Sequence, residues 1–374
     1  MLKLNEVSEI IMGQSPSSAT YNTAGEGLPF FQGNADFGDE HPNVRMFCSI
    51  PIKIAEVNDV LLSVRAPIGA VNVADKKCCI GRGLAAIRPQ KGKSITRYLF
   101  HLLIANRGSL ENKGTGSTFK AITGKVLNSV KVPHENVDEQ KAIADILDKI
   151  VATIRKRRVQ VSLCDDLVKS QFIEMFGNPQ TNEKGYPLLT VDDVIEFQGG
   201  SQPDKSYFEY TKTDNNVRLI QIRDYKTDKF VTYIPKNMVK RYCYADDIMI
   251  GRYGPPIFQI LQGIEGSYNV ALMKAIPKKG NKEFIRQFLK QDCLLHYLEG
   301  LSKRTAGQDG IQMDKLKQYP FPYPPIELQE QFAHFAEQTD KSKVLLTMKL
   351  FFHLYTAICL KAFEKSSQMM YNHR

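Results

Sequence analysis

Two hydrophobic patterns alternate along the chain and predict two kinds of element. Short apolar runs bounded by glycine, proline and asparagine are typical of β-strands. The clearest of these runs lie at 59–64, 80–87, 217–222 and 248–251. Amphipathic stretches at 95–106 and 282–301 favour helices. Strands and helices mixed in this way predict compact domains of the α+β class.

A much longer apolar repeat predicts a helix over 136–177. Asn136 is a suitable N-cap, Glu139 completes a capping box, and a Gly-Asn-Pro sequence at 177–179 ends the pattern. Between these limits, apolar residues recur at alternating steps of three and four, which is typical of a coiled-coil seam. The seam consists of Ile143, Leu147, Ile150, Ile154, Val161, Val168 and Met175. A helix of this length extends about 60 Å, and a second one of similar length is predicted from 326 to 363.

The two halves of the chain repeat each other. Five segments of the first half match five of the second in the same order, at an offset of roughly 185–190 residues. The matched pairs are 7–16 with 191–203, 58–65 with 246–252, 84–92 with 272–280, 127–133 with 316–322, and 139–143 with 328–332. We therefore predict a tandem duplication of a globular domain plus a long helix. The predicted parts are a first domain at 1–135, its helix at 136–177, a second domain at 178–325, and a second helix with a C-terminal tail at 326–374.

The charge of the chain favours a polyanionic partner. The 374 residues include 50 lysines and arginines against 40 acidic residues, which gives a net charge of +10. Basic side chains that neutralise phosphates release condensed counterions, so a basic surface binds nucleic acid even where it reads no sequence. The alternative is a basic protein whose charge has no such role.

One apolar stretch, 344–363, is long enough to cross a bilayer. It contains Lys349, His353 and Lys361, which are costly at membrane depth, so we favour a helix buried in a protein interface. The N-terminus lacks the apolar core of a signal peptide. Seven scattered cysteines show neither metal-ligand nor disulfide spacing. These features predict a cytoplasmic chain with no membrane partner and no metal.

No catalytic motif was found in the sequence. Gly124-Lys125 lacks the first glycine and the Ser/Thr of a P-loop, and Gly81-Arg82-Gly83 does not continue as a dinucleotide-binding loop. The two Pro-Pro sequences, at 254–257 and 323–326, lack the Asn/Asp and the aromatic residue of an amino-methyltransferase. We predict no catalytic residues and no cofactor. An enzyme with an unfamiliar site is the minor alternative.

Candidate DNA-binding residues lie at matching places in both halves. Arg65 and Arg252 each follow an apolar run, and polar loops at 112–120 and 302–308 combine glycine and hydroxyl side chains with cations that suit phosphates. The segments 21–48 and 207–241 show little similarity, and divergent loops on a shared scaffold are where specificity is stored. A purely structural role for the matching loops is the alternative. The full candidate set is Arg65, Arg82, Lys113, Thr115, Ser117, Lys120, Arg218, Arg223, Arg252, Lys303, Arg304 and Gln308.

The duplicated plan, together with three segments of the first half, resembles the specificity (S) subunits of type I restriction-modification enzymes. The segments are 114–122, 130–133 and 139–147. The second half departs from the first, since Thr305-Ala-Gly-Gln replaces the Gly-Thr-Gly-Ser loop and Pro325 replaces Asn136. The resemblance implies two target-recognition domains on an antiparallel coiled coil and a bipartite target in double-stranded DNA. It also implies two methyltransferase (modification) subunits and ATP-dependent endonuclease (restriction) subunits as partners.

Two other functions are compatible with the sequence. A coiled-coil scaffold with two protein-binding domains would also lack catalysis. A stand-alone methyltransferase or nuclease would bind S-adenosylmethionine or cut DNA as an isolated chain. Sequence-dependent and salt-dependent DNA binding separates both from a specificity subunit.

Overall fold

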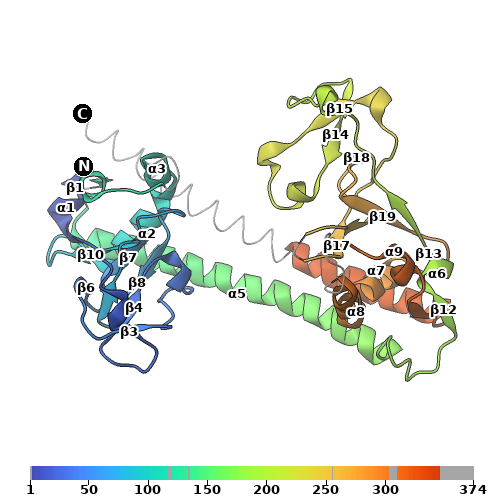
Figure 1. Ribbon diagram of the computed structural model, residues 1–374, viewed down its shortest axis with the longest axis horizontal. Coiled ribbons are helices and arrows are strands. Elements are labelled where there is room, and N and C mark those ends of the chain that lie inside the picture. The colour runs from blue at the N-terminus through green and yellow to red at the C-terminus, as the bar shows by residue number, and fades with distance from the viewer. Residues whose placement is uncertain (1, 116–119, 134, 255, 303–309, 346–374) are drawn as a thin grey trace. The chain divides into compact units, whose positions relative to one another are not determined.

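The computed structural model describes residues 2–115, 120–133, 135–254, 256–302 and 310–345. It divides the chain into two compact units, Met1–Arg155 and Lys156–Arg374, and the boundary falls within one long helix. Each unit mixes helices with small sheets, as the sequence predicts, and each is described by itself (Figure 1).

The first unit is built on a four-stranded antiparallel sheet in the order β2-β10-β7-β8. A five-stranded sheet, in the order β3-β5-β4-β9-β6, adjoins it and contains the parallel pair β4 and β9. The strands are β1 (Leu2–Lys3), β2 (Ser8–Met12), β3 (Tyr21–Asn22), β4 (Leu28–Phe31), β5 (Phe47–Cys48), β6 (Ile54–Ala55), β7 (Val60–Ser63), β8 (Val71–Val73), β9 (Cys78–Ile80), β10 (Leu84–Pro89) and β11 (Lys131–Val132). The helices are α1 (Leu4–Val7), α2 (Thr96–Ala105), α3 (Arg107–Asn112) and α4 (Gly124–Asn128).

The central strands of the first unit are buried on both faces. Along β7, Val60 and Leu62 belong to the core that contains α2, while Leu61 between them belongs to the core on the opposite face. Strand β10 alternates in the same way, because successive side chains of a strand point to opposite faces. This explains why 60–62 is a continuous apolar run rather than an alternating one.

The second unit repeats the main features of this topology, although its second sheet has three strands, in the order β15-β14-β18, where the first unit has five. Its four-stranded sheet has the order β13-β19-β16-β17, β14 pairs in parallel with β18, and β12 pairs with β20 as β1 pairs with β11. The strands are β12 (Leu188–Thr190), β13 (Ile195–Gly199), β14 (Asn216–Ile220), β15 (Tyr233–Pro235), β16 (Ile248–Gly251), β17 (Gln259–Gln262), β18 (Ser267–Tyr268), β19 (Leu272–Pro277) and β20 (Pro320–Pro322). The helices are α6 (Val191–Val194), α7 (Lys282–Leu289), α8 (Asp292–Ser302) and α9 (Met313–Lys317). The strand order therefore agrees with the duplication predicted from the sequence.

The predicted single helix over 282–301 is wrong, because the structure has two helices there. The break falls at Lys290 and Gln291, where the main-chain N–H of Gln291 turns to the carbonyl of Phe288. The side-chain amide of the buried Gln291 donates instead to the carbonyl of Gln287 at 3.0 Å. The side-chain amide of Gln291 thus donates to the carbonyl that the main-chain N–H of Gln291 would use in a continuous helix.

The first long helix, α5 (Val137–Phe176), confirms the predicted caps. The N–H of Glu139 donates to Oδ1 of Asn136 at 2.9 Å, and the N–H of Asn136 donates to Oε2 of Glu139 at 3.0 Å. Gly177 ends the helix with a φ of +74°, a left-handed backbone conformation that is unfavourable for residues with a side chain. The predicted seam residues are buried or half-buried, whereas most of their neighbours along α5 are exposed.

Residues 326–345 form a second helix that packs against α5 within the second unit. The ring of Phe332 lies 5.5 Å from those of Phe172 and Phe176, and Lys343 is 2.5 Å from the carboxylate of Asp165. The two described segments therefore run in opposite directions. The rest of the predicted helix, 346–363, lies outside the described residues, and no helix among the described residues is long and apolar enough to cross a membrane.

A buried glutamine joins each long helix to its own globular part. The amide Nε2 of Gln140 donates to the carbonyls of Lys93 and Glu135, and its Oε1 accepts from the N–H of Ile95, which precedes α2. Gln329 does the same in the second unit, where its Oε1 accepts from the N–H of Asn281 at 2.8 Å. The Glu-Gln and Leu-Gln pairs that open the two helices thus have a structural role.

Replacing Gln329 by leucine is expected to lower the free energy of unfolding by about 1–3 kcal/mol, because a buried N–H and a buried carbonyl lose their partners. The matched control is Gln338→Leu on the exposed face of the same helix, for which we expect little change. Urea unfolding of the purified chain measures both. Equal effects of the two substitutions would contradict the structural role of Gln329.

A carboxylate on α5 holds that helix to α2 in the first unit. Asp148 accepts two hydrogen bonds from Nε of Arg97, at 3.0 and 3.1 Å, and contacts Nε2 of His101 at 2.7 Å. Arg97 also pairs with Glu40 at 2.6 Å. Burial alone would raise the pKa of Asp148, but the hydrogen bonds from Arg97 and His101 outweigh it and lower the pKa below its ordinary value of 3.8.

Because the pKa of Asp148 is lowered in the folded chain, the free energy of unfolding depends on pH in a direction that can be derived. Its stabilising contribution is complete above pH 3.8, and it is lost as the pH falls through the lower pKa of the folded chain. Asp148→Asn is therefore expected to lower the free energy of unfolding by about 1–2 kcal/mol at pH 7, with a smaller difference from the original chain in acid. Urea unfolding at several pH values tests this, with the exposed Asp145→Asn as control. A difference that does not depend on pH would argue against the ion pair as its source.

Candidate nucleic-acid interface

The end of β7 in the first unit meets the predicted polar loop. Arg65, two residues after β7, forms a bridge with Ala121, and the N–H of Ala66 donates to the carbonyl of Lys120 at 3.1 Å. Thr115 pairs with Ala121 through hydrogen bonds of 3.0 and 2.9 Å. The fold therefore brings Arg65, Thr115 and Lys120, all exposed, to one edge of the unit.

Arg82 reaches the same edge from a third segment. The carbonyl of Gly83 accepts from the N–H of Val64 at 2.9 Å, which fixes the turn after β9 beside the residue that precedes Arg65. A Cβ on Gly83 would come within 2.3 Å of the carbonyl of Gln32, so this close approach requires glycine. The exposed guanidinium of Arg82 donates through Nε to Oγ of Ser15 at 3.2 Å.

The second unit has the corresponding edge. The N–H of Arg252 donates to the carbonyl of Ala271 at 2.9 Å, as Val64 does to Gly83, and Tyr253 forms a bridge with Gly310. The half-buried guanidinium of Arg252 lies 5.3 Å from the ring centre of Tyr253. The predicted loop residues Lys303, Arg304 and Gln308, like Ser117 in the first unit, lie outside the described residues. Lys113 is described and exposed, at the end of α3.

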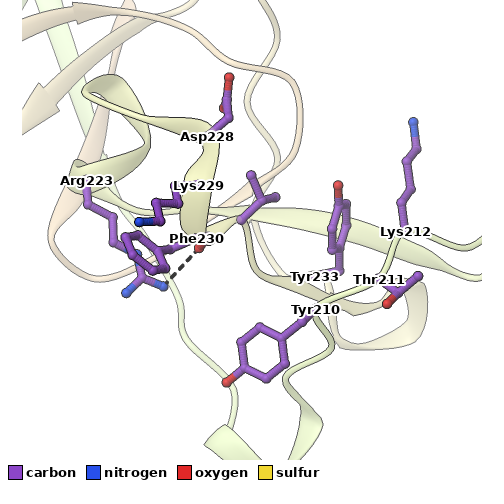
Figure 2. A pocket seen from close by; sticks show the side chains of 9 residues that line it. Tyr210, Thr211, Lys212, Arg223, Asp228, Lys229, Phe230 and Tyr233 are labelled. Carbon is purple, nitrogen blue, oxygen red and sulfur yellow. Dashed lines mark hydrogen bonds between the residues drawn. The ribbon is translucent and has the colours of Figure 1, made fainter. Parts of the chain in front are cut away.

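A groove of about 590 Å³ opens beside β14 and β15 in the second unit (Figure 2). Arg223 and Lys229 lie on one side of it, and Tyr210, Lys212 and Tyr233 lie on the other. The side chains of Tyr210 and Phe230 are 75% and 54% exposed, which is unusual for aromatic residues without a partner. Three cations and exposed rings suit phosphates and the faces of bases.

The two arginines predicted near this groove differ in their surroundings. Nη2 of Arg223 donates to the carbonyl of Phe230 and to Oγ1 of Thr232, both at 3.2 Å, and nearly half of its side chain is exposed. Arg218 is less exposed and pairs with Asp228 at 2.8 Å and with Asp224 at 3.7 Å. Arg223 is therefore placed to meet a ligand, while Arg218 supports the turn behind it.

The sequence interpretation did not identify the exposed rings of the groove or any residue of the segment 21–48. An exposed phenylalanine in a loop carries no sequence signal until the fold shows that it is uncovered. In the described part of the chain, no three His, Cys, Asp or Glu side chains gather as metal ligands do. Six cysteines are described and all are free thiols, four of them buried, while Cys359 lies outside.

Comparison with known proteins assigns this architecture to a family. The family model described as the type I restriction modification DNA specificity domain matches residues 1–161 and again residues 183–350. The chain belongs to this family. The two matches follow the repeat seen in the sequence and in the strand order of the two units, and they agree with the resemblance to specificity subunits.

Relatives of the chain carry the same family name. A Methanocaldococcus jannaschii protein named for the MjaX type I restriction enzyme specificity subunit is 46% identical over 156 residues, or 41% of this chain and 37% of the relative. The MjaIX specificity subunit of the same organism is 25% identical over 240 residues, or 56% of this chain and 55% of the relative. The chain thus matches little more than half the length of these two relatives at most.

A solved structure extends the likeness to the whole fold. The S subunit of a type I restriction-modification system from M. genitalium matches 96% of this chain and 93% of its own length, with a TM-score of 0.53. At 14% identity, this match shows a shared fold and nothing about residues.

Proposed function

We propose that the chain is the sequence-specific DNA-binding subunit of a type I restriction-modification complex. It directs two modification (methyltransferase) subunits and ATP-dependent restriction (endonuclease) subunits to a bipartite target in double-stranded DNA, and it has no catalytic site of its own. The observation that carries the proposal is the repeat. Two units of related topology each place basic residues at the end of matched strands, namely Arg65, Arg82 and Lys120 in the first unit and, among the described residues, Arg252 in the second, in a chain of this family.

Each unit is proposed to read one half of the target. The domains 1–135 and 178–325 are the two target-recognition domains. The helices 136–177 and 326–363, the second followed by a C-terminal tail to 374, pair as an antiparallel coiled coil that sets the distance between the half-sites. The packing of Phe332 against Phe172 and the ion pair between Lys343 and Asp165 support this pairing. We expect the complex to be cytoplasmic and to act on DNA there.

The roles of the basic residues follow from their exposure. Arg65, Arg82 and Lys120 in the first unit and Arg252 in the second are proposed to contact phosphates, because they lie at strand ends with hydroxyl and main-chain donors beside them. Phosphate contacts contribute affinity that weakens with salt and does not depend on sequence.

The experiment that tests the function is co-purification with the modification subunits, followed by binding to a library of randomised duplexes. A two-part motif with a fixed gap, seen with the modification subunits present, supports the proposal. Binding without sequence preference, or no DNA binding with those subunits present, would favour a protein-binding scaffold instead.

A further inference from the structure

The turn that follows β14 in the second unit is organised around one aspartate. Gln221 comes directly after the strand, and its N–H donates to Oδ2 of Asp224 at 3.1 Å. The short 3-10 helix η4 (Ile222–Tyr225) carries that aspartate, whose side chain is fully buried. Nε of Arg218 lies 3.7 Å from Oδ2, and Nε of Arg223 lies 3.9 Å from Oδ1.

The turn that follows β4 in the first unit has the same plan. Gln32 comes directly after the strand, and its N–H donates to Oδ2 of Asp36 at 2.7 Å. The aspartate again belongs to a 3-10 helix, η2 (Asn34–Asp36), and its Oδ1 accepts from Nη2 of Arg45 at 2.6 Å. In both units a glutamine, a capping aspartate and an arginine thus meet in one turn.

The two turns occupy equivalent places in the fold. Strand β4 pairs in parallel with β9 through Phe31 and Ile80, and β14 pairs in parallel with β18 through Ile220 and Tyr268. The sequences 21–48 and 207–241 show little similarity, and the spacing from glutamine to aspartate differs by one residue. Different sequences therefore build the same arrangement in the most divergent part of the repeat.

The turn adjoins the basic strand ends described above. In the first unit, the carbonyl of Gln32 accepts from the N–H of Gly83 at 3.2 Å, next to Arg82. In the second unit, the N–H of Asn269 donates to the carbonyl of Ile220, next to Gln221, at 3.1 Å. The segment that contacts the turn therefore carries Arg82 itself in the first unit, and in the second unit it continues to Ala271, whose carbonyl accepts from the N–H of Arg252.

The side chains of the two turns suit base edges. Gln32 is exposed, and Gln221 is half-buried with its amide donating to Oγ1 of Thr232 at 3.1 Å. Arg45 is 59% exposed although Asp36 holds it, and Arg223 is 48% exposed although Phe230 and Thr232 hold it. Arginine and glutamine make paired hydrogen bonds to purine edges in the major groove. Lysine is a compact charge on a flexible chain and lacks the planar fork of arginine, so it is a poorer donor of such paired bonds. In the second unit Arg223 also lines the open groove that Tyr210 and Lys212 border (Figure 2).

Burying an ionised aspartate costs free energy unless its carboxylate is hydrogen-bonded or paired with a cation. Oδ1 of Asp224 and Nε of Arg218 are buried and form no hydrogen bond to any described residue. A helix cap alone needs one oxygen of the aspartate, and that oxygen is Oδ2. The second oxygen, Oδ1, lies 3.9 Å from Nε of Arg223, close enough for charge attraction, while hydrogen bonds from Nη2 to Phe230 and Thr232 fix the guanidinium.

We propose that this turn is the base-reading element of each unit. Gln32 and Arg45 read the half-site of the first unit, and Gln221 and Arg223 read that of the second. Asp36 and Asp224 are positioning residues that aim the arginines. The inference rests on the proposed function, because it names the residues through which each unit would choose its sequence.

The test uses the full chain in complex with its modification subunits and the randomised duplex library. Arg45→Lys is expected to reduce discrimination at one half-site by on the order of 10- to 100-fold, and Arg223→Lys at the other half-site, because lysine keeps the charge and loses the paired bonds. The unchanged half-site is an internal control in each case. Arg158→Lys, the same substitution at an exposed place on α5, is expected to change neither.

Asp36→Asn tests the positioning role. Discrimination at the half-site altered by Arg45→Lys is expected to fall, while the salt dependence of binding and the thermal midpoint stay close to those of the original chain. If the original complex shows no bipartite preference, the proposed function itself fails. If it shows one, and Arg45→Lys and Arg223→Lys either keep it or weaken both halves equally, the base-reading turn is overturned and the proposed function stands.

Discussion

Replacing Phe332 by alanine is expected to lower the free energy of unfolding of the second unit by about 3–5 kcal/mol. Phe332 is fully buried, and its ring makes edge contacts with Phe172 and Phe176 of α5. Those rings also pack against Phe284 of α7. Removing the ring of Phe332 leaves a cavity where three helices meet, namely the helix 326–345, α5 and α7. We expect these packed helices not to move together far enough to fill the cavity.

The matched control is Phe230→Ala, the same substitution at a half-exposed ring of the groove. It should change stability by less than about 1 kcal/mol, since little apolar area leaves water there. Urea unfolding with hydrogen exchange of α7 measures both variants. A loss below about 1 kcal/mol for Phe332→Ala would mean that residues 326–345 contribute little to the core of the second unit.

The elements that sequence reasoning predicted well are those with local chemical signals. The caps of α5 depend on Asn136, Glu139 and Gly177, whose side chains or backbone freedom act within a few residues, and all three behave as predicted. The strand at 248–251 coincides with β16 because its apolar run is bounded by turn residues on both sides. In contrast, the break between α7 and α8 depends on a side-chain amide that replaces a main-chain donor, which no periodicity reveals.

The matched strands located the candidate site only approximately. Strand pairing makes Arg252 the counterpart of Val64, and Tyr253 the counterpart of Arg65, so the predicted match of the two arginines is wrong by one residue. Arg65 and Arg252 were found because each follows a matched strand, and the fold does bring the first beside Thr115 and Lys120. The turn at Gln32 was missed because its equivalence to Gln221 depends on strand pairing rather than on sequence. Arg218 was chosen by residue type, and its two aspartate partners became visible only in the fold.

The repeat has a physical consequence for how the chain can evolve. Gln140 and Gln329 attach each long helix to the residue before α2 or α7 through Oε1, and each amide also donates to a carbonyl just before its own long helix. This attachment lies in a different part of each unit from the turns at Gln32 and Gln221. Changes in the turns therefore leave the helix attachment of each unit intact, so under the proposed function half-site preference can vary independently of the helices.

Shortening both long helices by one heptad is expected to shorten the accepted gap between half-sites by about three base pairs. Seven residues of helix correspond to about 10.5 Å, and stacked base pairs are about 3.4 Å apart. A seven-residue deletion keeps the apolar seam in phase, so pairing of the helices should survive. Extending the register of Lys343 and Asp165 along the predicted second helix gives deletions of 156–162 in α5 and of 346–352, which lie outside the described residues.

Library binding of the complex measures the gap directly, and the half-site sequences themselves should not change because both turns are untouched. Binding to the original target should weaken strongly, since three base pairs also rotate one half-site by about 100° around the duplex axis. Deleting 156–162 alone is the control, because it removes the match between the two helices and should abolish binding rather than shift the gap. An unchanged gap in the double deletion would show that the helices do not set the distance between the half-sites, whatever the units read.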